Sequence, residues 1–403
     1  MDGTTFHFEQ GLAMPEGALH AFLCHRGEAL GLARQAPGVQ ARVLEASLLL
    51  CSRDARDFTT ARWLFSQLKV AGIRGGHVAA IGAALDGDMA RACRIYDVVL
   101  AQDPRDLLAL AVAQAFSYLM GEPQALRERA ARAYAAWPEH HAVLSLYAFA
   151  LEECGEYGAA ERLARRALEI EPLDLRAHHA VAHVMEMQGR FAEGVRWMGE
   201  RSPYWTGAGA ASTHQWWHLA LYHVELERPA QALAIYDRRL HGEGLSELID
   251  ASALLWRLHL KGHALEERFR RLAARWAAHA EDAHCAFNDV HAMMAFAGAG
   301  RRDCVRRLLA AQERRIAQPW GTNHDMTRLV GLPACRAIAA YGRGEFAEAE
   351  ALLRALPPVA HRIGGSHAQR DVLHLTRYAA ALKKSHSRSG IRAASPFALS
   401  YAA

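Results

Sequence analysis

Turn-forming residues divide the first half of the chain into apolar, helix-length segments of constant spacing. Glycine recurs every 34 residues and proline keeps the same interval, at Gly87, Gly121, Gly155 and Gly189 and at Pro104, Pro138 and Pro172. A glycine lets the chain turn sharply after a helix, and a proline prevents a helix from continuing. The pattern therefore predicts helical hairpins whose helices are each roughly 14 residues long.

The segment 155–172 shows why the spacing suits a hairpin. Ala160 and Ala167 are seven residues apart, so they share one face of a helix, and their small side chains let two helix backbones approach closely. One hairpin cannot bury its apolar face alone and must stack on its neighbours. Residues 73–203 carry these glycines and prolines in register and resemble the tetratricopeptide repeat.

The spacing loosens in the second half of the chain. Similar turns recur at 227–232, 300–303 and 344–349, which indicates insertions, expected at 202–212 and 357–365. No stretch alternates with period two for long enough to predict a sheet. We predict an all-α fold, a right-handed superhelix of stacked helical hairpins with insertions in the C-terminal half. Its expected parts are an N-terminal helical cap at 1–72, regular repeats at 73–203, divergent repeats at 204–384 and a flexible tail at 385–403.

The composition indicates the cellular location of the protein and limits its possible partners. Apolar residues make up 51% of the 403 residues and charged residues 22%, the balance of a globular chain. The net charge of +4 is small and the basic residues are dispersed, which argues against a nucleic-acid partner. No apolar run approaches the roughly 20 residues of a membrane-spanning helix. The seven cysteines contain no C-x-x-C pair and the first residues lack a secretion signal, so we predict a cytoplasmic protein.

Histidine is the unusual residue of this chain, with 23 copies. Arg176, His179, His183 and Glu186 follow one another at steps of three or four and therefore share a stripe on one helix. The resemblance to tetratricopeptide repeats implies that this stripe lines a concave groove.

Two further helices carry histidines at helical spacing. Ser212 and Gln215 have capping-box spacing, which predicts a helix start at Ser212. His214 and His218 then share a face, and of the adjacent Trp216 and Trp217 one is expected to pack while the other lines the groove. Further on, His284, Asn288 and His291 occupy a single stripe.

Histidines four residues apart on a helix can bind one metal ion, and zinc, iron or copper would suit them. The H-E-x-x-H motif is missing, so a metal site, an organic ligand pocket and ordinary hydrogen-bonded histidines all remain possible. We predict His183 and His218 as catalytic residues, with Asp289 or Glu186 to orient them. The predicted ligand-binding residues are Arg176, His179, His214, Trp217, Asn288, Asp289 and His291.

The segment 363–371 has two interpretations. Ser366 and Gln369 have capping-box spacing, which accounts for them structurally. The free backbone N–H groups at that helix start, with His367 and Arg370, would also form a cradle for a carboxylate or phosphate. Elsewhere, Asp250 and Asn323 are each interpreted as a cap or turn residue, or as an acceptor that orients a histidine.

The same segments resemble the tetratricopeptide repeat protein 38 family over nearly the whole chain. The motifs are His178–Val184, His214–Ala220, Phe287–Ala292 and Gly364–Asp371. The resemblance implies an all-helical superhelix in the cytosol and carries no established reaction. Gln215 departs from the family pattern, where asparagine is expected, which weakens any role for that amide.

Taken together, the sequence predicts a solenoid enclosing a pocket lined by histidine and tryptophan. The expected ligand is a small molecule with a carboxylate or phosphate, and any chemistry would use histidine as acid and base or a bound metal. The alternative is a non-catalytic adaptor that binds a peptide in an open groove. A self-assembling scaffold is the third possibility.

Overall fold

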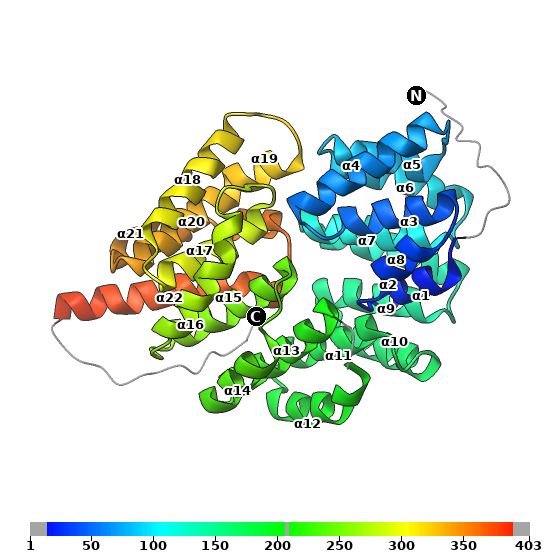
Figure 1. Cartoon of the computed structure of the whole chain (residues 1–403). Coiled ribbons are helices and arrows are strands. Elements are labelled where there is room, and N and C mark those ends of the chain that lie inside the picture. Colours follow the sequence, from blue (N-terminus) through cyan, green and yellow to red (C-terminus); the bar gives the residue numbers. More distant parts are fainter. Residues whose placement is uncertain (1–13, 206–208, 390–403) are drawn as a thin grey trace. The chain divides into compact units, whose positions relative to one another are not determined.

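The computed structural model describes residues 14–205 and 209–389. Within these ranges every regular element is a helix, as Figure 1 shows. Contacts divide the chain into two compact units, one formed by residues 1–184 with 203–212 and the other by residues 185–202 with 213–403. The division falls inside two α-helices and one 3-10 helix, and each unit is described by itself below.

The first unit consists of antiparallel helical hairpins in chain order. Its helices are α1 (Glu16–Leu23), α2 (Ala29–Gln35), α3 (Val39–Leu50), α4 (Ala55–Val70), α5 (Gly76–Leu85), α6 (Met89–Gln102), α7 (Leu107–Met120), α8 (Pro123–Ala136), α9 (His141–Glu153), α10 (Tyr157–Ile170) and the greater part of α11 (Leu175–Met187).

The repeat residues act as the spacing predicted. The glycines at 87, 121, 155 and 189 follow the ends of α5, α7, α9 and α11, and all four have φ between +68° and +80°. This left-handed conformation is accessible to glycine at little cost. The prolines at 104, 138 and 172 follow α6, α8 and α10. The predicted hairpins are therefore confirmed over this part of the chain.

Small residues allow the helices of the first unit to pack closely. Ala160 and Ala167 of α10 are fully buried. Ala160 packs with Leu151 of α9 and Val184 of α11, while Ala167 packs in a second cluster that includes Leu144. A larger side chain at either alanine would push the helices apart, because helix backbones pack 8–10 Å from each other.

The second unit continues the hairpin pattern with longer connections. Its helices are α12 (Phe191–Arg201), most of α13 (Ala210–Glu225), α14 (Pro229–Arg239), α15 (Leu245–Leu260), α16 (Glu266–Trp276), α17 (Ala286–Gly298), α18 (Arg302–Ile316), α19 (Thr322–Met326), α20 (Leu332–Gly342), α21 (Phe346–Arg354) and α22 (His367–Ser389). A π-helical turn at Thr327–Gly331 joins α19 to α20.

A large apolar core holds the second unit together. α22 packs against α15, α20 and α21, so the end of the described chain returns to the middle of this unit. Trp256 of α15 is fully buried and donates a hydrogen bond from Nε1 to Oγ1 of Thr376 on α22, 2.9 Å away. This bond satisfies the polar atom of a large aromatic side chain that would otherwise be costly to bury.

The predicted all-α fold with less regular hairpins in its C-terminal half is confirmed. At three places the structure differs in detail from the prediction. α13 begins at Ala210, two residues before the predicted start at Ser212. The expected insertion at 357–365 is largely a 3-10 helix at Pro357–Ile363. α22 extends to Ser389, and residues 390–403 of the predicted tail lie outside the described residues.

Candidate functional site

The predicted histidine stripe of α11 lies against α9. His183 is fully buried, and its Nδ1 is 3.4 Å from Oε2 of the equally buried Glu152. His179 lies one turn away, with its ring 4.3 Å from that of His183 between centroids, and it stacks on Phe149. The structure therefore brings the two histidines together beside a carboxylate and an aromatic ring.

The histidines of α13 have carboxylate partners in the second unit. Nδ1 of His218 is 2.7 Å from Oε2 of Glu186, and Nδ1 of His214 is 2.9 Å from both carboxylate oxygens of Asp250. Because an ionised carboxylate only accepts hydrogen bonds, each Nδ1 donates its proton. Glu186 therefore orients His218, and Asp250 orients His214. The sequence had offered Glu186 or Asp289 as the orienting residue, and Asp250 either as a cap or as an acceptor for a histidine.

The charge around these histidines favours a cation over an anion. Each unit places carboxylates directly at the imidazoles, namely Glu152 in the first and Glu186 and Asp250 in the second. A carboxylate or phosphate ligand beside them would meet like charge, and such repulsion is strong where water is excluded. A metal cation would be attracted, and histidine ligands commonly donate their second nitrogen to a carboxylate.

Of the two tryptophans of α13, Trp217 is the one that packs in the core, although it was predicted to bind a ligand. Trp217 is fully buried, with His214 stacked on it at 5.1 Å and the guanidinium of Arg257 5.6 Å from its ring. Trp216 is partly exposed beneath Arg239. The structure thus places Trp217, which was predicted to contact a ligand, in the apolar core.

Arg176 connects two parts of the first unit. Its guanidinium donates hydrogen bonds to the backbone carbonyls of Leu23 and Phe22 at the end of α1, at 3.0 and 3.2 Å. Both carbonyls lie in the last turn of α1, and that of Phe22 also accepts a hydrogen bond from the backbone N–H of His25 at 3.0 Å. The described contacts of Arg176 therefore explain its position structurally, and its predicted ligand contact stays a prediction.

The predicted residues of α17 are all buried. Nδ1 of His291 is 2.7 Å from the backbone carbonyl of Phe287, and Asp289 accepts a hydrogen bond from Gln312 at 3.1 Å. Asn288 is also buried. Burial raises the pKa of Asp289 to about 7, an effect that the hydrogen bond from Gln312 only partly offsets. Asp289 therefore titrates near neutrality, as a general acid or base would.

The glycine loop before α22 forms the predicted capping box. The backbone N–H of Ser366 donates to Oε1 of Gln369 at 3.1 Å, and the N–H of Gln369 donates to Oγ of Ser366 at 3.3 Å. His367 is exposed, while the guanidinium of Arg370 donates to the carbonyl of Gly365. The anion cradle of His367 and Arg370 stays a prediction.

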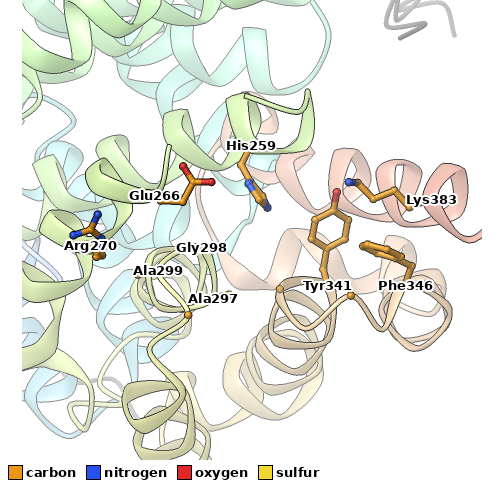
Figure 2. A pocket seen from close by; sticks show the side chains of 12 residues that line it. His259, Glu266, Arg270, Ala297, Gly298, Ala299, Tyr341, Phe346 and Lys383 are labelled. Atoms are coloured by element: carbon orange, nitrogen blue, oxygen red, sulfur yellow. The ribbon is translucent and has the colours of Figure 1, made fainter. Parts of the chain in front are cut away.

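A pocket that the sequence did not reveal lies in the second unit, as Figure 2 shows. Its volume is about 450 Å³, and it is partly open to solvent. Helices α15, α16, α17, α20, α21 and α22 contribute to it, and its principal side chains are His259, Glu266, Arg270, Tyr341, Phe346 and Lys383. The only sequence signal was Lys383–Lys384, which holds two of the four lysines in the chain.

The pocket combines cations with an aromatic wall. The ammonium of Lys383 lies 5.4 Å from the centre of the Phe346 ring. The hydroxyl of Tyr341 is buried and has no hydrogen-bond partner among the described residues. Burial lowers the pKa of His259, and the charge of Lys383 lowers it further, which favours the neutral imidazole. These groups offer hydrogen-bond donors and positive charge to a ligand.

Comparison with known proteins gives a partial structural similarity and no family. No protein-family profile matches the chain. Its fold is similar to the crystal structure of the APC/C hetero-tetramer Cut9-Hcn1, with a TM-score of 0.42 and 13% sequence identity over 90% of this chain and 69% of that chain. In the described part of the chain, no helix is both long and apolar enough to cross a bilayer.

Proposed function

We propose that this chain is a protein-binding module whose second unit takes a carboxylate of a partner peptide in the pocket of Figure 2. The observation that carries the proposal is the placement of Lys383 and the unpartnered Tyr341 hydroxyl on one side of this open pocket. An ammonium and a hydroxyl are donors to a carboxylate. Phe346 offers apolar surface to the adjoining part of the peptide.

The charges of the pocket support an anionic ligand. Lys383 forms no ion pair within the described residues, whereas the neighbouring Lys384 is 3.1 Å from Glu350. Arg270 also lines the pocket, but Glu267 compensates its charge at 2.7 Å. Glu266 is the one carboxylate that lines the pocket among the described residues. A carboxylate ligand would therefore neutralise the positive charge of Lys383.

Screening of a peptide library with free C-terminal carboxylates tests the proposal. Binding peptides are then measured by fluorescence polarisation as free acids and as amides. We expect amidation and Lys383→Met each to weaken binding at least tenfold, and Lys384→Met to leave it unchanged, because Lys384 points to Glu350. Absence of binding peptides, or equal losses for the two lysine variants, would contradict the proposal.

A second function is supported by a separate observation, the carboxylates bonded to Nδ1 of His214 and His218. We infer that His214 and His218 hold a divalent metal ion such as zinc, iron or copper rather than an organic anion. Carboxylate partners fix the ring orientation and raise the basicity of the other nitrogen. Elemental analysis of the purified chain, with His214→Gln and His218→Gln as variants, tests this inference, and unchanged metal content would contradict it.

Two broader expectations also stand as proposals. Membership in the tetratricopeptide repeat protein 38 family is supported by the motifs of α11, α13, α17 and the glycine loop. A cytoplasmic location is supported by the seven cysteines, which are all described and are thiols rather than disulfides. Fractionation of cells that express the tagged chain tests the location.

A further inference from the structure

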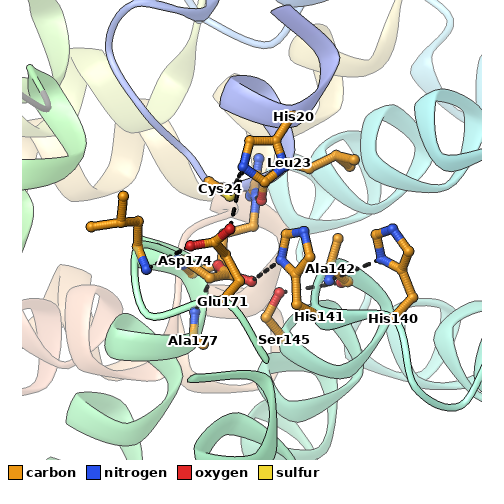
Figure 3. Close-up of polar contacts among 12 residues, drawn as sticks. His20, Leu23, Cys24, His140, His141, Ala142, Ser145, Glu171, Asp174 and Ala177 are labelled. Carbon is orange, nitrogen blue, oxygen red and sulfur yellow. Dashed lines mark hydrogen bonds and ion pairs between the residues drawn. The ribbon is translucent and has the colours of Figure 1, made fainter. Parts of the chain in front are cut away.

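A cluster of potential metal ligands lies in the first unit, apart from the residues discussed above. His20 of α1, Cys24 directly after α1 and His141 at the start of α9 each offer one ligand atom, and these atoms lie within 4.8 Å of one another. Figure 3 shows the three side chains gathered around Glu171 and Asp174. We propose that His20, Cys24 and His141 form a zinc site.

The distances within the cluster suit a small cation. Sγ of Cys24 and Nε2 of His20 are 3.6 Å apart. In a tetrahedral zinc site with Zn–S near 2.3 Å and Zn–N near 2.0 Å, ligand atoms are about 3.5 Å apart. This pair is therefore already at ligand spacing, and His141 needs a shift of about an ångström. Mixed nitrogen and sulfur donors are those that zinc prefers.

Asp174 supplies an independent indication of a metal site. Its Oδ2 lies 2.8 Å from Nδ1 of His141, and its side chain is fully buried. The other oxygen, Oδ1, accepts hydrogen bonds from the backbone N–H groups of Arg176 and Ala177 at the start of α11. The carboxylate is thus fixed by a helix and in turn fixes the imidazole, as in the carboxylate–histidine–zinc arrangement of known sites.

The backbone around Cys24 is held in place without a metal. The N–H of Leu175 donates to the carbonyl of Cys24 at 3.0 Å, and Arg176 donates to Leu23 and Phe22. These bonds join the end of α1 to the start of α11. The backbone that carries Cys24 is therefore fixed before the ion binds, which lowers the entropic cost of binding.

Charge and access also fit a cation. The carboxylates of Asp174 and Glu171 place negative charge near Cys24, which favours a cation at the cluster. Zinc would supply the compensating positive charge and release the thiol proton to solvent. Oε2 of Glu171 lies 3.4 Å from Nε2 of His20, and half of the His20 side chain is exposed. Glu171 or a water molecule would be the fourth ligand, and His20 provides the entry path.

Cobalt substitution tests the site, because a thiolate bound to Co²⁺ gives a charge-transfer band in the near ultraviolet. The full chain is stripped with a chelator and titrated with Co²⁺ and then with Zn²⁺. We expect the band to appear with one equivalent of Co²⁺ and to disappear when zinc displaces it. Cys24→Ser should abolish the band, and His141→Gln should weaken Co²⁺ binding at least tenfold.

Matched variants distinguish this site from the remaining thiols and histidines of the chain. Cys154→Ser removes another thiol of the same unit, which contacts the carbonyl of Pro123, and should retain the band. His214→Gln and His218→Gln should also retain the band. The test of this site is therefore independent of the metal function inferred for those two histidines. The proposal is overturned if the wild-type chain gives no thiolate band, or if the band persists in Cys24→Ser.

Discussion

His218 and Glu186 form a buried pair between the first helices of two successive hairpins, with Nδ1 2.7 Å from Oε2. Similar pairs among the described residues join His77 to Asp106, His141 to Asp174, His183 to Glu152 and His214 to Asp250. The partners are 29 to 36 residues apart in sequence, close to one repeat of 34. Histidine–carboxylate pairs therefore connect neighbouring hairpins.

The pair of His218 and Glu186 is expected to contribute to stability. His218→Ala removes a donor from a buried carboxylate, and breaking a buried ion pair in this way costs about 3 kcal/mol. The free energy of unfolding, measured by urea denaturation at pH 7, should fall by about that amount. His361→Ala, on an exposed 3-10 turn, serves as the control and should change stability little. Equal effects of the two substitutions would show that the pair has no such role.

Asp289 makes stability depend on pH. Burial raises its pKa in the folded chain to about 7, above the ordinary value of 3.8, so the folded state holds the proton more tightly than the unfolded state. This contribution to stability is complete below about pH 4 and is lost as the pH rises to about 7.

Asp289→Asn removes the titrating group and keeps an acceptor for Gln312. The variant should match the wild type near pH 4 and exceed it at pH 8 by up to about 4 kcal/mol. Urea denaturation at a series of pH values measures the difference. A pH-independent difference between the two chains would contradict the raised pKa.

Gly365 is confined by α17 as well as by its own backbone. Its φ is +79°, and a Cβ there would lie 2.4 Å from Cε2 of Phe287. Gly155 has nearly the same φ, +80°, but open space around it. Gly155→Ala should therefore cost about 1 kcal/mol, the penalty of the backbone alone.

Gly365→Ala adds the steric overlap with Phe287, and overpacking of this kind typically costs 1–3 kcal/mol more. Thermal unfolding of both variants checks this order. If the two alanines have equal effects, the contact between the glycine loop and Phe287 is not a constraint on packing.

The sequence by itself determined the hairpins of this protein. The glycines and prolines of the 34-residue repeat set where helices end, and Ser366 with Gln369 set the capping box before α22. These features depend on backbone conformation and on hydrogen bonds over three or four residues, so local rules suffice to predict them. The same rules also identified Ala160 and Ala167 as contact positions.

Only the tertiary structure decided which side chains meet. The spacing marked His214 and His218 as neighbours, but their carboxylates, Asp250 and Glu186, lie on other helices. The pocket near Lys383 and the cluster of His20, Cys24 and His141 likewise combine residues from helices far apart in sequence. The stacking of hairpins brings these side chains together. This stacking depends on the summed packing of many apolar side chains, which no short stretch of sequence specifies.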